Sequence, residues 1–107
     1  MTDRELLELA AKAAGIEIGE WDEQMQVFDA SKVDGIPIWN ALTSDRDALR
    51  LAVKLGFGMS TCGVATVVHH YGEPCRRRFE EPHCKDADAA TRRAIVRAAA
   101  EIGRAMG

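Results

Sequence analysis

Aromatic residues, prolines and cysteines are scarce in this chain. Only 6 % of its 107 residues are aromatic, and it has three prolines and three cysteines. So few aromatic side chains leave little surface for stacking nucleic-acid bases. The cysteines are odd in number and have no CxxC spacing, which favours reduced thiols over a secreted disulfide framework. No apolar run approaches the roughly eighteen residues that a membrane-spanning helix needs, so we expect no contact with a membrane.

The remaining composition is ordinary for a globular protein, with 47 % hydrophobic and 29 % charged residues. A chain of this length buries about two thirds of its unfolded surface without disulfides or metals. We therefore expect a single domain over residues 1–107. The opening residues include acids and no apolar signal core, which indicates a cytoplasmic protein.

The two halves of the chain carry opposite charge, although the net charge is only −3. Residues 1–47 contain eleven acids and four bases, a net −7, and residues 48–107 contain six acids and ten bases, a net +4. Attraction within the monomer is the simplest explanation. A basic C-terminal face that meets an acidic partner, either nucleic acid or protein, is the alternative.

The segment from Ser44 to Gly56 predicts a helix with two distinct faces. Ser44 and Asp47 match the capping box of a helix start, and Gly56 matches a left-handed end. One stripe is apolar and contains Ala48, Leu51, Ala52 and Leu55, whereas Arg46, Arg50 and Lys54 form a basic stripe. The basic stripe is by default a solvated face, and a binding surface for phosphate or an acidic protein is the alternative.

Two further helices are predicted at the ends of the chain. Thr2 and Glu5 form a second capping box, and the apolar stripe after it stops at Gly15. Asp86 begins the last helix, whose apolar residues step by three or four through Ile95. We expect Leu51 and Ile95 to be core residues of opposing elements.

The middle of the chain predicts strands. The run 64–71 is largely apolar on both alternating sets, which is typical of a strand covered on both faces. A turn at 72–74 and the run 75–80 suggest a hairpin, and 16–39 suggests one or two short strands with Pro37 near an edge. These elements predict an α+β fold: a small, mainly antiparallel sheet of three to four strands with three helices packed on both faces, an α/β/α sandwich. A two-layer arrangement with all helices on one face of the sheet is the alternative.

Three strings in the sequence resemble small phage and prophage proteins of the phage ABA-sandwich type. They are WN-x-L-x-x-D-x-DALRLAVKL at 39–55, LLELAAKAAGIE at 6–17 and DADAATRRAIVRAAAEIG at 86–103. The resemblance covers about half of the chain and implies a sandwich fold, a phage-related origin and a bacterial host. It implies no catalytic residue, and its matching positions Trp39, Asn40, Asp45 and Asp47 form a loop-and-cap pattern.

The cysteines and histidines are the first candidates for chemistry. His69, His70, Cys75, His83 and Cys84 include zinc-ligand types, but none of the usual ligand spacings occurs. A histidine pair with buried free thiols is the simpler interpretation, and Cys75 activated by His70 is a further alternative. Asp45 and Asp47 could bind magnesium, although complementing a helix start explains them.

Arginines supply the second candidate, a possible interaction surface. Arg76 and Arg78 fall on one side of a strand, and the last helix presents further arginines on its polar side. The possible interaction surface consists of Arg76, Arg78, Arg93, Arg97 and Arg104.

We therefore expect a small, cytoplasmic, phage- or prophage-encoded protein of unknown biochemical function, non-enzymatic, without cofactor or metal, and acting through contacts with a host or phage protein. A nucleic-acid-binding regulator that uses the arginine surface is one alternative. A Cys/His metal-binding protein or thiol enzyme is the other.

Overall fold

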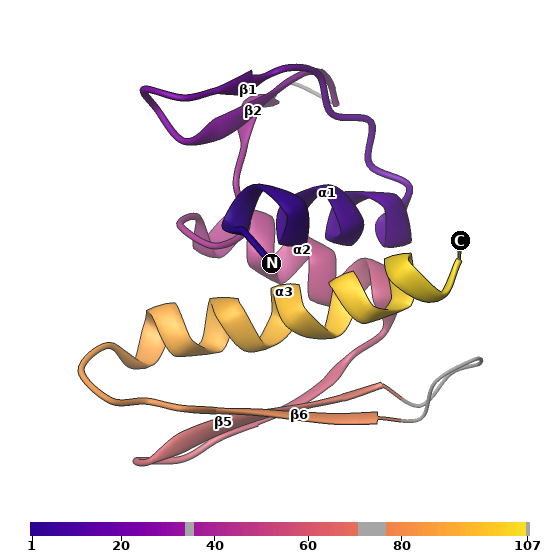
Figure 1. The fold of residues 1–107 in the computed structure, drawn as a ribbon. Helices are drawn as coiled ribbons and strands as arrows, with labels where there is room; N and C mark the ends of the chain where they lie inside the picture. Colours follow the sequence, from indigo (N-terminus) through magenta and orange to yellow (C-terminus); the bar gives the residue numbers. More distant parts are fainter. Residues whose placement is uncertain (34–35, 71–76, 107) are drawn as a thin grey trace.

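The structure is a computed structural model and describes residues 1–33, 36–70 and 77–106. Figure 1 shows the helices in the middle of the molecule and strands at its opposite ends. The helices are α1 (Asp3–Ala14), α2 (Asp45–Leu55) and α3 (Ala87–Ala105). The strands are β1 (Trp21–Asp22), β2 (Val27–Val33), β3 (Ile36–Trp39), β4 (Gly58–Thr61), β5 (Ala65–His70) and β6 (Arg77–Pro82).

Local side-chain hydrogen bonds set the helix ends, as the sequence predicted. The hydroxyl of Thr2 accepts the Glu5 N–H, and the hydroxyl of Ser44 accepts the Asp47 N–H. The carboxylate of Asp86 does the same for Ala89 at the start of α3. Gly15 and Gly56 end α1 and α2 with φ of 68° and 69°, a left-handed conformation that glycine adopts without steric cost.

The strands form two separate antiparallel sheets. Sheet A has the order β1-β2-β3 and sheet B the order β4-β5-β6. Pro37 lies in the edge strand β3, as predicted. The described residues of 16–39 form three strands rather than the one or two predicted. Strand β4 was not predicted, because Gly58, Ser60 and Thr61 give it no apolar alternation.

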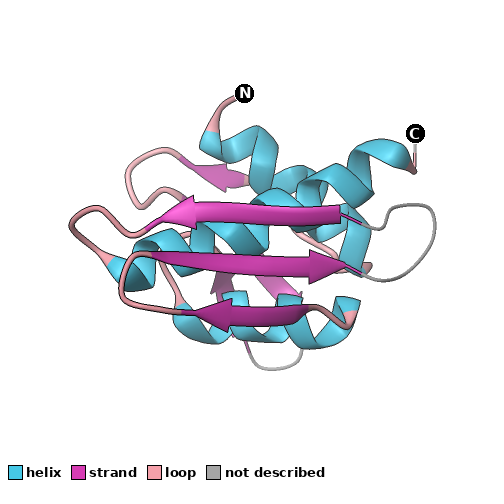
Figure 2. Ribbon diagram, turned by 90° about the horizontal axis from the view of Figure 1, so that it is seen from below, coloured by secondary structure: helices cyan, strands magenta, loops and turns pink. Residues whose placement is uncertain are grey.

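The α+β class and the three helices are confirmed, but the layers differ from the prediction. In the part of the chain that the structure describes, six strands form two sheets instead of three to four in one, and the helices lie between the sheets rather than on both faces of one. Figure 2, seen from below, shows sheet B with the helices behind it and no helix in front.

Strand β5 is therefore covered by helices on one face only, and the prediction of two covered faces was wrong. Thr66 and Val68 are buried toward α3. On the outer face, Val67 and His69 are half-buried and pair with Glu80 and Arg78 of β6. Long cross-strand side chains are able to shield such positions without a second helix layer.

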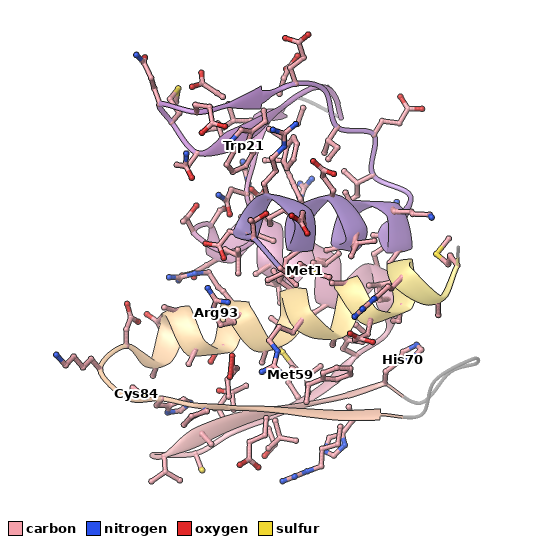
Figure 3. The ribbon with its side chains drawn as sticks, in the orientation of Figure 1. Met1, Trp21, Met59, His70, Cys84 and Arg93 are labelled. Atoms are coloured by element: carbon pink, nitrogen blue, oxygen red, sulfur yellow. The ribbon has the colours of Figure 1, made fainter. Side chains whose placement is uncertain are left out.

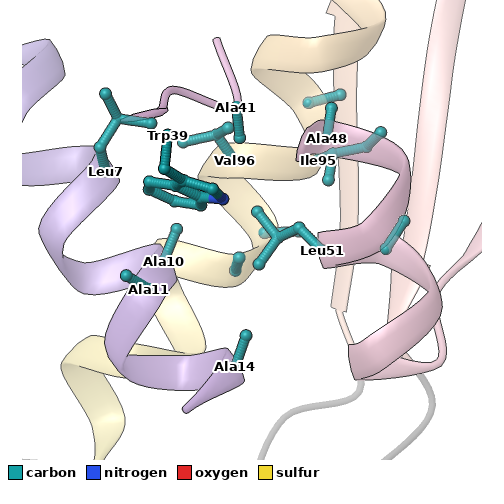
Figure 4. Close-up of a cluster of buried hydrophobic side chains, with 14 of the residues drawn as sticks. Leu7, Ala10, Ala11, Ala14, Trp39, Ala41, Ala48, Leu51, Ile95 and Val96 are labelled. Carbon is teal, nitrogen blue, oxygen red and sulfur yellow. The ribbon is translucent and has the colours of Figure 1, made fainter. Parts of the chain in front are cut away.

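The core lies where the three helices meet. Trp39 is 2 % exposed and lies among Leu7 of α1, Leu51 of α2 and Val96 of α3 (Figure 4). Leu51 and Ile95 are both buried, which confirms them as core residues. The small side chains of α1 and α3 allow these two helices to pack closely, and Trp39 fills the space beside them.

Candidate protein-contact surface

The predicted arginines of α3 are held in ion pairs with residues of their own chain. Their partners come from α1, from β6 and from α3 itself. The nitrogen to oxygen distances are 3.3 Å for Arg93 and Asp3, 3.1 Å for Arg97 and Glu81, and 3.2 Å for Arg104 and Glu101. Much of the charge that a phosphate-binding surface would use is therefore balanced within the molecule.

Arg78 lies apart from those arginines. Phe79 and Glu81 turn toward α3, where Glu81 pairs with Arg97, so the alternating residue Arg78 points to the outer face of sheet B. There it pairs with Glu80 at 2.9 Å. Arg76 lies outside the described residues. The structure thus does not bring Arg78 together with the α3 arginines on one surface.

The described histidines and cysteines of the predicted cluster do not converge. His70 lies beside Arg77, whereas the His83 N–H donates to the carbonyl of Val64 just before the other end of β5, about 20 Å away at the usual rise per residue. Figure 3 shows His70 and Cys84 at opposite ends of sheet B. Cys75 lies outside the described residues. Within 1–33, 36–70 and 77–106, no group of three His, Cys, Asp or Glu could hold a metal ion.

His83 belongs instead to a hydrogen-bond chain that ties β5 to α3. The Thr91 hydroxyl donates to the Ala87 carbonyl at 2.8 Å, so its oxygen accepts from Thr66, 2.7 Å away. Since the Thr66 proton is then used, its oxygen accepts from Nε2–H of His83 at 2.8 Å. The imidazole thus donates to the hydroxyl, the opposite of a general base that activates a nucleophile.

The free thiols that the structure describes are exposed, so the expectation of buried thiols was wrong. Cys62 lies in the turn between β4 and β5, and Cys84 lies between β6 and α3 with φ of 49°. Backbone N–H groups of Val64, and then of Ala65, lower the pKa of the Cys62 thiol, because they stabilise the thiolate. The sequence did hold a signal for this exposure that was missed: both cysteines fall in connections between strands and helices rather than in apolar runs.

The predicted loop-and-cap residues have a structural role. Asp47 is buried, and one of its carboxylate oxygens accepts the Asn40 N–H at 3.0 Å. The Asn40 side chain accepts from the Leu42 N–H and donates to the Gln26 carbonyl, at 2.8 and 2.6 Å. Asp45 pairs with Arg92 of α3. These bonds join the residue before β2, the loop and α2, whereas the second Asp47 oxygen, Oδ1, is buried without a hydrogen-bond partner among the described residues and lies 3.8 Å from Arg46 Nε.

The exposed side of α2 is the surface that best fits a partner. Leu49 and Val53 are 57 % and 72 % exposed, although they lie one helical turn apart and form an apolar pair. Neither Arg50 nor Lys54 beside them forms an ion pair with any residue in the described part of the chain. We call this surface the α2 face; it comprises Arg46, Leu49, Arg50, Val53 and Lys54.

A shallow hollow of about 230 Å³ continues the α2 face toward β4. Its apolar lining includes Met59 of the edge strand β4, Leu49 and Ile95 of α3. The apolar surface of α2 stays open because sheet B ends at β4. The sequence did show the basic stripe at 46–54, but Leu49 and Val53 could be recognised as uncovered only once the sheet was placed.

Searches with family models, among curated proteins and among solved structures find no match to this chain. In the described residues, no helix is both long and apolar enough to cross a membrane.

Proposed function

We propose that this chain is a non-enzymatic protein that acts by binding another protein, and that the α2 face is its contact surface. The observation that carries the proposal is that exposed Leu49 and Val53 lie beside two bases, Arg50 and Lys54, that form no ion pair with any described residue. Apolar side chains at the centre of an interface provide the contact area, and charges at its rim select the partner.

The charge of the α2 face indicates an acidic partner. Arg46, Arg50 and Lys54 are exposed, and of the three only Arg46 has a carboxylate of the described residues nearby, with its Nε 3.8 Å from Asp47 Oδ1. By contrast, all arginines of α3 have carboxylate partners. This contrast favours protein contact through α2 over nucleic-acid binding through the predicted arginine surface. The phage or prophage origin and the cytoplasm of a bacterial host remain predictions.

The test compares partner capture by three forms of the full chain in a bacterial lysate. The double variant Leu49→Ser with Val53→Ser removes the apolar pair from exposed positions, so it leaves the fold intact. Met106→Ser is the matched control, because Met106 is also exposed but lies at the end of α3. We expect mass spectrometry to identify a protein captured by the parent and the control and lost with the double variant. Capture that is the same for all three forms would contradict the proposal.

A further inference from the structure

The outer face of sheet A combines acidic and apolar side chains. Phe28 and Trp39 turn toward the helices, so Val27 and Ile38, which alternate with them, point away. A hollow of about 550 Å³ opens on this outer side. We call it the acidic sheet face; its lining residues are Glu20, Trp21, Asp22, Glu23, Met25, Val27, Asp29 and Ile38.

The acidic sheet face is held in shape by its own hairpin. The Asp22 carboxylate accepts the N–H groups of Gln24 and Met25 at 2.9 and 3.0 Å, and Gln26 turns the chain back with φ of 56°. Met25 and Ile38 are left 60 % and 40 % exposed. A surface that is already ordered loses little conformational entropy on binding, so these apolar side chains are available to a partner.

The acidic sheet face and the α2 face are complementary. One is a hollow with the carboxylates of Glu20 and Glu23 beside Met25 and Ile38, and the other is a convex helix that offers three bases around Leu49 and Val53. A symmetric contact of either face with itself would bring like charges together, which costs affinity. Contact between the two faces instead places opposite charges around an apolar centre.

We propose that the α2 face of one copy binds the acidic sheet face of a second copy of this chain. The inference rests on the proposed function and names its partner. Because the contact joins two different surfaces, each copy keeps one face of each kind available. Such head-to-tail contacts close into a ring or continue as a chain of copies.

Analytical ultracentrifugation of the full chain tests this contact, from about 5 μM to about 500 μM. Arg50→Glu with Lys54→Glu reverses the α2 face, and Glu20→Lys with Glu23→Lys reverses the acidic sheet face. We expect the parent to self-associate and each reversed form alone to associate at least about tenfold more weakly, because each then opposes like charges. Salt at about 1 M, where charges are screened beyond about 3 Å, should weaken the parent similarly.

An equimolar mixture of the two reversed forms provides the decisive measurement. The acidic α2 face of one form then meets the basic sheet face of the other, so the mixture should recover the association that each lacks alone. Lys12→Glu with Lys85→Glu is the matched control for the reversed α2 face, since both lysines are exposed, lie outside the two faces and give the same change in net charge as Arg50→Glu with Lys54→Glu. It should associate like the parent.

Two results would overturn the second copy as the partner: a parent that stays monomeric over this range, or a mixture that stays as weak as its components. The lysate experiment separates this failure from that of the proposed function. If the chain is monomeric but Leu49 and Val53 still determine capture of another protein, only the self-contact is rejected.

Discussion

Gly103 of α3 packs directly against the backbone of Leu9 in α1. A Cβ built on Gly103 would stand 2.8 Å from the carbonyl carbon of Leu9 and closer still to its oxygen. Real Cβ atoms do not approach backbone atoms so closely, so this glycine sets the distance between the two helices. The position is buried and helical, which makes it a sensitive probe of the packing.

Gly103→Ala should destabilise the protein. Alanine is about 1 kcal/mol better than glycine within an exposed helix, but the clash with a backbone that cannot rotate away should leave a net loss of about 1–3 kcal/mol. Gly63→Ala is the control, because its added Cβ meets nothing within 4 Å. Urea denaturation measures both, and a Gly103→Ala protein as stable as the parent would show that α1 and α3 are less tightly packed.

Leu51→Ala should lower the free energy of unfolding by about 2–5 kcal/mol, the usual cost of a cavity in a packed core. Leu51 is fully buried beside Trp39 (Figure 4). Val53→Ala changes the same helix at an exposed position and should stay within about 0.5 kcal/mol of the parent. Equal effects of the two substitutions in chemical denaturation would show that Leu51 and Val53 do not lie on the buried and exposed sides of α2.

Thr66→Val should destabilise the protein by about 1–3 kcal/mol, because it keeps the shape but leaves Nε2–H of His83 without its acceptor. It also removes the donor to Thr91. Thr61→Val, on the exposed part of β4, is the control and should have little effect. Thermal unfolding curves that coincide for Thr66→Val and the parent would mean that the hydrogen-bond chain contributes nothing to stability.

The Cys62 thiol should react with iodoacetamide at lower pH than an ordinary cysteine. Hydrogen bonds from the Val64 and Ala65 N–H groups lower the pKa of Cys62, so more of the reactive thiolate is present near neutral pH. The experiment uses Cys75→Ser with Cys84→Ser, so that Cys62 alone reacts, and compares its rate against pH with that of an unstructured cysteine peptide. If the reaction rate of Cys62 reaches its midpoint at the same pH as that of the peptide, or at a higher pH, the lowered pKa is refuted.

Helix boundaries could be predicted from the sequence because their causes are local. The Thr2 and Ser44 hydroxyls cap N–H groups three residues away, and Gly15 and Gly56 adopt the left-handed conformation on their own. No residue distant in the sequence is needed for these bonds. The three-residue spacing of the capping pairs and the positions of the glycines are therefore enough to predict where these helices begin and end.

The partners of the charged residues could not be predicted, because they depend on which elements become neighbours. Arg93 pairs with Asp3, ninety positions away, only because α1 packs on α3. Helical periodicity correctly placed Arg93, Arg97 and Arg104 on the polar side of their helix, but it could not show that carboxylates of α1, β6 and α3 balance them.

The sequence by itself determined the class of the fold, the three helices and their core stripes, because each depends on residues within a turn or two of one another. Only the tertiary structure decided that the strands form two sheets and that sheet B ends at β4. Strand pairing depends on long-range contacts, which local periodicity does not encode. Since sheet B stops at β4, Leu49 and Val53 stay exposed beside Arg50 and Lys54, and the surface that we propose for binding follows from that edge.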